Sequence, residues 1–183
     1  SGKALYIGIS SYSANKTREM IKILNSRGIK LFIHQPSYSM INRWIEKDLT
    51  KTLTKNGVGC IAFSPLAQGF LSNKYLKGIP RGTRVSENSS FSKNLITENN
   101  LKIINNLNSI AKRRNQSLSQ LALAWVLNNK AVTSALIGVR TVAQLKDNLA
   151  ALNNLKFTKD EIKKIDKNAK EGNINLWAPS SSY

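Results

Sequence analysis

The sequence has little of the chemistry on which many active sites depend, with one cysteine and one histidine among 183 residues. A single cysteine excludes a disulfide within the chain. The position of Cys60 in the strand-like run GCIAF favours a buried, unreactive thiol in a reducing compartment. The single histidine, His34, has no neighbouring cysteine or carboxylate, so we predict no metal site. A serine or cysteine nucleophile would have only His34 as its base, and the residues by themselves indicate no catalytic set.

Long hydrophobic runs and targeting segments are also absent. No apolar run approaches the ~20 residues of a membrane-spanning helix. The first residues, SGKALYIGIS, lack the basic segment, apolar stretch and cleavage site of a signal peptide. We therefore expect a cytoplasmic protein without a membrane span. The composition, 41% hydrophobic and 21% charged, is typical of a globular chain with one core.

Acidic residues are few, and 28 Lys and Arg against 10 Asp and Glu give a net charge of +18. Such an excess can indicate nucleic-acid binding. The lysines, however, are spread along the expected helices, and no aromatic residues alternate with them as a base-stacking surface requires. We interpret them as solvated helix faces and expect no nucleic-acid partner. The positive field can still speed the association of phosphorylated ligands.

Short apolar runs alternate with amphipathic segments along the chain. The expected strands are 4–9, 31–34, 60–63 and 132–137. The expected helices follow Ser13, end near Asn56, cover 98–114, follow Ser117, run from Thr141 to about Leu152 and follow Thr158. A long irregular segment is expected over 64–93. Four βα repeats predict parallel strands buried on both faces, either in an open doubly wound sheet or in part of a (β/α)8 barrel. The Rossmann fingerprint is absent after the first strand.

Polar clusters follow all four expected strands, at Ser10-Ser11, His34-Gln35, 63–66 and 138–140. Ligands of parallel α/β folds bind beyond the carboxyl ends of the strands. Any one cluster is explained by a turn, but four at one edge favour a ligand site.

The last cluster has the strongest physical argument. Gly138 allows close approach of a ligand, Arg140 offers a fork of donors to a phosphate, and Thr141 begins a helix whose free N–H groups favour anions. The first two turns of that helix carry amide and carboxylate groups suited to a ribose or a purine, on Gln144, Asp147 and Asn148. A well-capped helix with an exposed arginine is the alternative interpretation.

Five segments, in order, resemble the second half of the aldo-keto reductase family: GISSYS, IHQPSYSMINRW, GVGCIAFSPLAQGFLSNKY, GIPRGTR and SALIGVRTVAQLKDNLAAL. The likeness is greatest to the branch that holds the bacterial L-glyceraldehyde 3-phosphate reductases and the potassium-channel β subunits. It favours the TIM barrel over the open sheet. It implies that residues 1–183 form the C-terminal, cofactor-binding half of a (β/α)8 barrel, with four βα units and a C-terminal helix.

The resemblance also implies bound NADP(H) in an extended conformation. It places polar groups near the nicotinamide (Ser10, Ser11 and Gln35) and an aromatic ring against it (Phe63). It implies a loop under the pyrophosphate (Ser64, Pro65, Leu66, Ala67 and Gln68) with two cationic partners (Lys74 and Arg84). It further implies a site for the adenosine 2′-phosphate and adenine (Gly138, Arg140, Gln144, Asp147 and Asn148).

The family's catalytic Asp, Tyr, Lys and His come from its first four strands, and this chain begins at what resembles the fifth. No catalytic residue is therefore assigned, although Tyr12, Tyr38 and Tyr75 lie nearest to the strand ends. We expect a truncated or split reductase of aldehydes such as glyceraldehyde 3-phosphate or methylglyoxal. Its open barrel edges would bind a complementary N-terminal half or a second copy. The alternative is a non-catalytic nucleotide- or partner-binding module resembling the channel β subunits.

Overall fold

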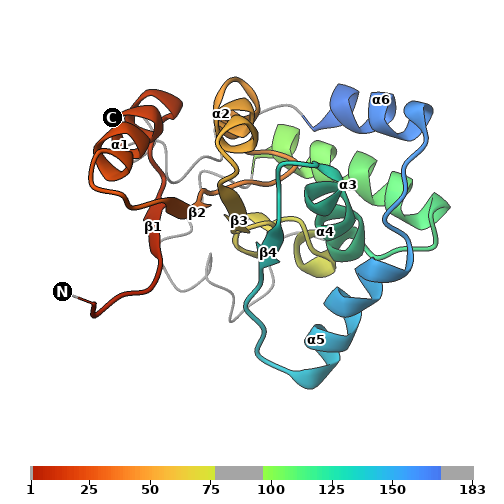
Figure 1. The fold of residues 1–183 in the computed structure, drawn as a ribbon. Coiled ribbons are helices and arrows are strands. Elements are labelled where there is room, and N and C mark those ends of the chain that lie inside the picture. Colours follow the sequence, from red (N-terminus) through yellow and green to blue (C-terminus); the bar gives the residue numbers. More distant parts are fainter. Residues whose placement is uncertain (1, 77–96, 170–183) are drawn as a thin grey trace.

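The computed structural model describes residues 2–76 and 97–169 (Figure 1). Its four strands are β1 (Ile7–Ser10), β2 (Leu31–Gln35), β3 (Gly59–Phe63) and β4 (Ser134–Leu136). The α-helices are α1 (Ala14–Asn25), α2 (Leu49–Lys55), α3 (Glu98–Arg113), α4 (Leu118–Asn128), α5 (Val142–Leu149) and α6 (Lys159–Asn168). Four 3-10 turns, η1 (Trp44–Glu46), η2 (Ala67–Gly69), η3 (Asn73–Tyr75) and η5 (Ala150–Asn153), complete the described elements.

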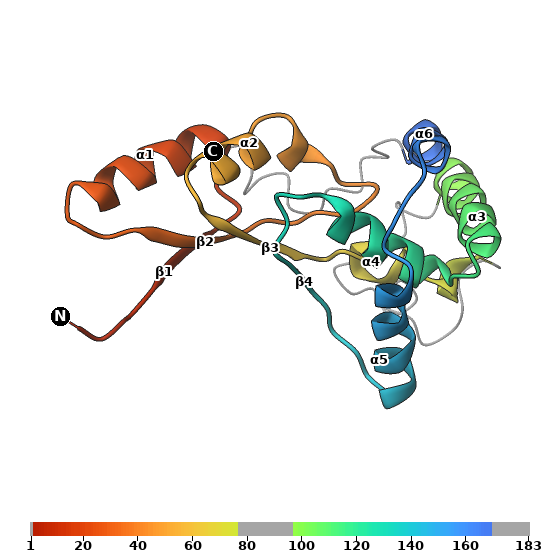
Figure 2. The ribbon, with the colours of Figure 1, turned by 45° about the vertical axis from the view of Figure 1, so that its right-hand side comes forward.

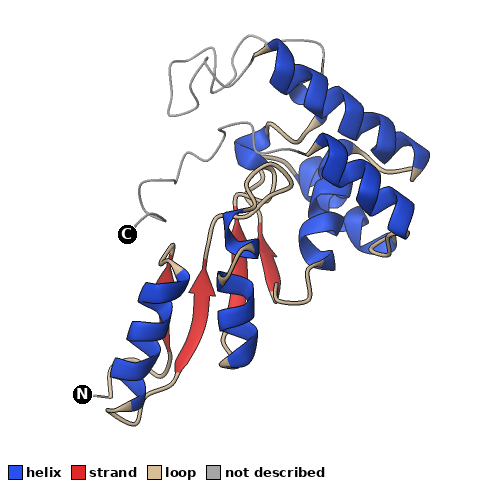
Figure 3. Ribbon diagram, turned by 90° about the horizontal axis from the view of Figure 1, so that it is seen from above, coloured by secondary structure: helices blue, strands red, loops and turns tan. Residues whose placement is uncertain are grey.

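The strands form one parallel sheet in the order β1-β2-β3-β4, so each strand lies beside the next one along the chain. A doubly wound sheet instead reverses its strand order at a switch point and carries helices on both faces. Here α1, α2 and α4 contact β2, β3 and β4, and Figure 2 shows α1 and α2 on one side of the strands. Figure 3 shows the strands side by side. This topology is that of an incomplete (β/α)8 barrel, as expected.

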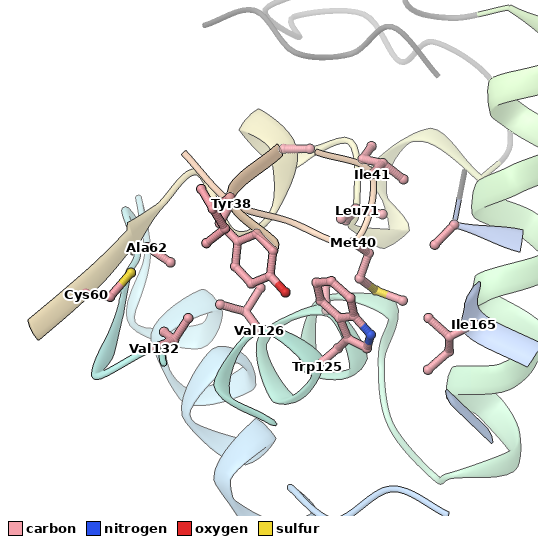
Figure 4. Close-up of a cluster of buried hydrophobic side chains, with 14 of the residues drawn as sticks. Tyr38, Met40, Ile41, Cys60, Ala62, Leu71, Trp125, Val126, Val132 and Ile165 are labelled. Atoms are coloured by element: carbon pink, nitrogen blue, oxygen red, sulfur yellow. The ribbon is translucent and has the colours of Figure 1, made fainter. Parts of the chain in front are cut away.

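The side of the sheet that faces the helices carries the core. His34 and Cys60 pair in register on this side and are fully buried, and Ala62 follows two residues later. Figure 4 shows the cluster where the loop after β2 packs on α4, and the rings of Tyr38 and Trp125 have centroids 5.2 Å apart. Cys60 is free and buried, as predicted, and burial raises the pKa of its thiol to about 11, which disfavours the nucleophilic thiolate.

The opposite face of the sheet is partly exposed among the described residues, which do not bury the strands on both faces as the sequence predicted. Gly8, Ile33 and Gly59 lie in one row across β1, β2 and β3. A Cβ on Gly8 would lie 2.9 Å from Cγ2 of Ile33, and one on Gly59 would lie 3.2 Å from its Cγ1. One branched side chain thus covers the two glycines beside it. Layers of branched side chains of this kind fill the interior of a closed barrel.

Capping explains most helix starts, and side-chain contacts explain where the observed boundaries differ from the expected ones. Ser117 and Thr158 begin α4 and α6 with the predicted capping boxes. The expected single helix before Asn56 is divided into η1 and α2, and Glu46 at the end of η1 accepts hydrogen bonds from Tyr38 and Arg43. The strand expected over 4–9 begins only at Ile7, and Tyr6 is exposed, with its ring stacked on Phe32.

Candidate functional site

A cleft of about 990 Å³ lies at the carboxyl ends of β3 and β4. Its walls come from the loop after β3 and from the segment that leads from β4 into α5. Parallel pairing of β3 with β4 places these segments side by side, although some 75 residues separate them. The cleft gathers eleven of the sixteen residues expected to hold a cofactor: Phe63, Ser64, Pro65, Leu66, Gln68, Lys74, Gly138, Arg140, Gln144, Asp147 and Asn148.

The loop Ser64–Gly69 has an unusual backbone. Ser64, Ala67 and Gln68 adopt left-handed φ values of 53°, 46° and 57°, and Gly69 follows at 94°. Each non-glycine residue in this region costs roughly 1–2 kcal/mol, and such strain concentrates at binding sites. Two hydrogen bonds stabilise the turn, from Ala67 N–H to the Ser64 carbonyl and from Gly69 N–H to the Leu66 carbonyl, both 2.9 Å. Ala67 is buried and does not line the cleft, so its side chain anchors the loop instead.

Two features of the cleft fit a ligand with polar and anionic groups. Oε1 of Gln68 is buried and has no hydrogen-bond partner among the described residues. A Cβ on Gly138 would meet no atom within 4 Å, so the backbone there is open to close approach. An unpaired buried amide oxygen costs about 1–3 kcal/mol, and a donor on a ligand would remove that cost.

The charged groups of the cleft come from both walls. Lys74 lies beside the Tyr75 ring, with Nζ 5.8 Å from its centroid, and Arg140 lies just before α5. Within residues 2–76 and 97–169, neither side chain forms an ion pair. Asp147 is the one acidic residue among the lining residues. The cleft therefore carries an excess of positive charge, suited to phosphate groups.

The start of α5 differs in one detail from the capping box predicted for it. Thr141 Oγ1 accepts from the Gln144 N–H at 3.2 Å, as expected, but Oε1 of Gln144 accepts from the N–H of Arg140 at 2.8 Å. The Gln144 side chain thus folds back over the turn and fixes the backbone of Arg140. Its amide nitrogen can still donate to a ligand, and its oxygen keeps one lone pair.

The residues of the α4 capping box make one further contact, which the sequence did not predict. Ser117 Oγ and Gln120 Nε2, at the start of α4, lie 3.1 and 2.6 Å from the carboxylate oxygens of Asp147. Sequence reasoning identified Ser117 and Gln120 only as a helix cap. No local pattern predicts a contact across about 30 residues.

The residues predicted for the nicotinamide end form a second cluster. Ser10 Oγ donates to the Gln35 carbonyl at 2.7 Å, and Ser11 N–H donates to the same oxygen at 3.1 Å. Ser11 has a left-handed φ of 58°. The structure brings these residues together at the ends of β1 and β2, but they are not among the lining residues of the cleft. Arg84 lies outside the described residues.

Beneath this cluster, His34 is fully buried and its Nε2 lies 3.2 Å from the Tyr12 carbonyl. Because a carbonyl oxygen only accepts, Nε2 carries the proton. Nδ1 has no partner within the described segments. Burial lowers the pKa of His34 from 6.5 to about 4, against the opposing effect of the bond to Tyr12. The imidazole is neutral near pH 7 and supports the loop that follows β1.

Tyr38 is no candidate proton donor. Its side chain is 1% exposed, and its hydroxyl donates to Glu46 at 2.7 Å and accepts from Asn129 at 3.1 Å. Burial raises the pKa of this phenol, and the hydrogen bond to Glu46 and its charge raise it further. Tyr75 lines the cleft but is also buried. No group of three His, Cys, Asp or Glu side chains in the described part of the chain is placed to hold a metal ion, and none of its helices is long and apolar enough to cross a membrane.

A one-sided parallel sheet of this topology is typical of a barrel-type α/β protein, and the positive charge of the cleft at its carboxyl edge is suited to an anionic ligand. The model of the aldo/keto reductase family matches residues 1–170, and the chain belongs to this family.

The curated relatives agree with this assignment. The chain is 48% identical to the L-glyceraldehyde 3-phosphate reductase of Escherichia coli K12, over 99% of this chain and 54% of the relative. It is 34% identical to a putative voltage-gated potassium channel subunit beta of Schizosaccharomyces pombe, over 90% of this chain and 50% of the relative. It is 32% identical to a probable voltage-gated potassium channel subunit beta of rice, over 91% of this chain and 52% of the relative. The chain thus spans about half the length of the curated relatives it matches.

Proposed function

We propose that this chain forms the C-terminal, NADP(H)-binding half of a reductase that reduces aldehydes by hydride transfer. The observation that carries the proposal is the cleft, in which Lys74 and Arg140 come from two distant segments and neither forms an ion pair among the described residues. The 48% identity to an L-glyceraldehyde 3-phosphate reductase supports small aldehydes as the substrate class. Glyceraldehyde 3-phosphate and methylglyoxal are the candidates that we propose.

The residues of the cleft fit an extended dinucleotide in a specific order. Arg140 and the N-terminus of α5 would hold the 2′-phosphate, and the Ser64–Gln68 loop with Lys74 would hold the pyrophosphate. Asp147 and Asn148 would face the adenine, and Phe63 would lie against the nicotinamide. Bound NADPH would supply the hydride. The part of this chain is to orient the cofactor and to keep the hydride-bearing face toward the open side of the sheet.

We further propose that a second half-barrel closes the open sheet face and supplies the proton donor. It would belong either to a longer form of this polypeptide or to a separate chain. The relatives are about twice as long as the matched region. The apolar side chains left exposed on and after α5 are suited to such a neighbour: Val142, Leu145, Leu149 and Leu152. Their spacing of three and four residues places them on one stripe.

The test is the preference for NADPH over NADH, measured by fluorescence titration of the purified protein. A charge-assisted bidentate contact is worth roughly 1.5–3 kcal/mol, or about tenfold to a hundredfold in affinity. We expect Arg140→Ala to remove that preference and to leave NADH binding unchanged. Lys146→Ala is the matched control, because Lys146 is an exposed cation on α5 that does not line the cleft. Equal affinities for the two cofactors in the unaltered protein would refute the assignment.

A second candidate is a nucleotide- or partner-binding protein without turnover. Two relatives are named as potassium channel β subunits, and the buried Tyr38 is unsuited to proton donation. The two candidates are separated by measuring NADPH oxidation with glyceraldehyde 3-phosphate or methylglyoxal. The assay uses this chain together with the half-barrel that we propose closes its sheet. Tight NADPH binding without aldehyde-dependent oxidation would favour the second.

A further inference from the structure

The loop that follows β2 makes one further backbone pairing with β3, at the edge of the cleft. The regular ladder between the two strands stops near the end of β2, and a single additional pair, Ser37 and Phe63, lies beyond it. Pro36 comes just before this pair and has no N–H to donate, so it cannot continue the ladder as a donor. Phe63 N–H donates to the Pro36 carbonyl at 2.9 Å, and Tyr38 N–H donates to the Phe63 carbonyl at 3.1 Å. The segment 36–38 therefore binds both backbone polar groups of Phe63.

The two sides of Phe63 are supported in different ways. On one side, Phe63 pairs in register with Leu136 of β4, which belongs to a regular strand. On the other side, the segment 36–38 is not part of a regular strand, so the sheet alone does not fix its position. Phe63 itself lines the cleft. The direction of its ring therefore depends on what holds the segment 36–38 in place.

Side-chain hydrogen bonds hold Ser37, which is 1% exposed. Trp44 Nε1 donates to the Ser37 carbonyl at 2.8 Å and lies 3.2 Å from its Oγ, and Asn42 Nδ2 donates to the same Oγ at 3.1 Å. Both donors are fixed in turn, because the Trp44 side chain packs against the core and Asn42 exchanges two backbone hydrogen bonds with Ser39, both 3.1 Å. We call Ser37, Asn42 and Trp44 the Ser37 clamp.

We propose that Asn42 and Trp44 are positioning residues, which hold Ser37 and, through its pairing with Phe63, the ring that faces the nicotinamide. This proposal rests on the proposed NADP(H) site, in which Phe63 lies against the nicotinamide. The clamp residues are not among the described lining residues of the cleft, so we expect their effect to reach the cofactor through Phe63. Loss of a clamp hydrogen bond should loosen the nicotinamide end of the cofactor and leave the 2′-phosphate and adenine end as it is.

The experiment compares NADPH with 2′-phospho-ADP-ribose, which is the same dinucleotide without its nicotinamide. Dissociation constants for both are measured by titration calorimetry of the purified chain, for the unaltered protein and for Trp44→Phe, Ser37→Ala and Phe63→Leu. We expect the unaltered protein to bind NADPH about twofold to tenfold more tightly, the range for one aromatic stacking contact. Each of the three variants should bring the two constants close together, chiefly by weakening NADPH. The fluorescence of bound NADPH, excited directly in the nicotinamide band, should change in the same three variants.

The ratio of the two affinities separates positioning from a general loss of stability. Thr17→Val is the matched control, because the fully buried Thr17 on α1 donates to the Ser13 carbonyl at 2.9 Å and does not line the cleft. It also removes a buried hydroxyl, and it should leave the ratio unchanged.

If Trp44→Phe does not fold, the milder Ser37→Ala still tests the proposal, since it keeps the carbonyl that accepts from Trp44. An unchanged ratio in the folded clamp variants or in Phe63→Leu would overturn the proposal, and so would an equal change in Thr17→Val. Failure of the unaltered protein to bind either compound would refute the proposed function as well, whereas equal binding of both would refute only this inference.

Discussion

The buried imidazole of His34 makes the stability of this protein depend on pH in a window that can be worked out. The pKa of His34 is about 4 in the folded protein, against 6.5 for an imidazole in water, which is the value expected for the unfolded chain. Between pH 4 and pH 6.5 the unfolded chain binds a proton on His34 that the folded protein does not bind. The contribution of the neutral imidazole to the free energy of unfolding is therefore fully present above about pH 6.5, and it is lost as the pH falls toward 4. The whole window corresponds to about 3 kcal/mol, of which about 2 kcal/mol is lost between pH 7 and pH 5.

The assay is urea unfolding at these two pH values, followed by tryptophan fluorescence and circular dichroism, for the unaltered protein and for His34→Gln. Glutamine keeps a donor for the Tyr12 carbonyl but does not titrate. His34 is the only histidine, and the depressed pKa of Glu161 acts below this range, so the difference between the two proteins isolates the imidazole. We expect the unaltered protein to lose about 2 kcal/mol more than the variant. Equal losses would mean that His34 is not buried in neutral form.

Two further predictions concern packing and association. Arg114→Lys should lower the free energy of unfolding by about 2–4 kcal/mol. The guanidinium donates hydrogen bonds to the Asn154 and Lys156 carbonyls and pairs with Glu161, and it lies 3.9 Å from the Phe157 ring centroid. A lysine ammonium cannot make all of these contacts. Denaturant titration should show no such loss for the exposed Arg113→Lys, and equal effects would contradict this account. Val142→Lys with Leu149→Lys should raise the monomer fraction of this chain in sedimentation velocity, because the apolar stripe is otherwise open to self-association, whereas Ile23→Lys on α1 should not.

The order of the elements could be predicted from the sequence, because it depends on local signals. Apolar runs of four to six residues alternate with amphipathic segments, and Ser or Thr caps precede five of the helices, as at Ser13 and Thr97. The place of the cleft could also be predicted in outline. Carboxyl ends of neighbouring parallel strands lie together, so the loop after β3 and the segment after β4 had to meet.

Side-chain direction could not be predicted, because it is decided by partners far away in the sequence. Tyr38 points into the core because Asn129, 91 residues away, and Glu46 satisfy its hydroxyl. Arg43 is directed by Asp166, 123 residues away, as well as by Glu46. The Gln144 side chain folds back and accepts a hydrogen bond from the N–H of Arg140. Hydrophobic periodicity predicts none of these three side-chain directions.

Under the proposed function, cofactor binding depends on the cleft at the carboxyl edge of the sheet, whereas reduction also needs the half-barrel that closes its open face. The lining residues of the cleft come from β3, β4, α4, α5 and the loops between them, all contained in this chain. Tyr38 and Tyr75 are buried, and we propose that the proton donor comes from a second half-barrel that docks at the open face around Ile33. Loss of Arg140 should therefore weaken cofactor affinity with little effect on the rate at saturation. A change at the closing face should do the reverse, since it alters the geometry of proton delivery without touching the cleft.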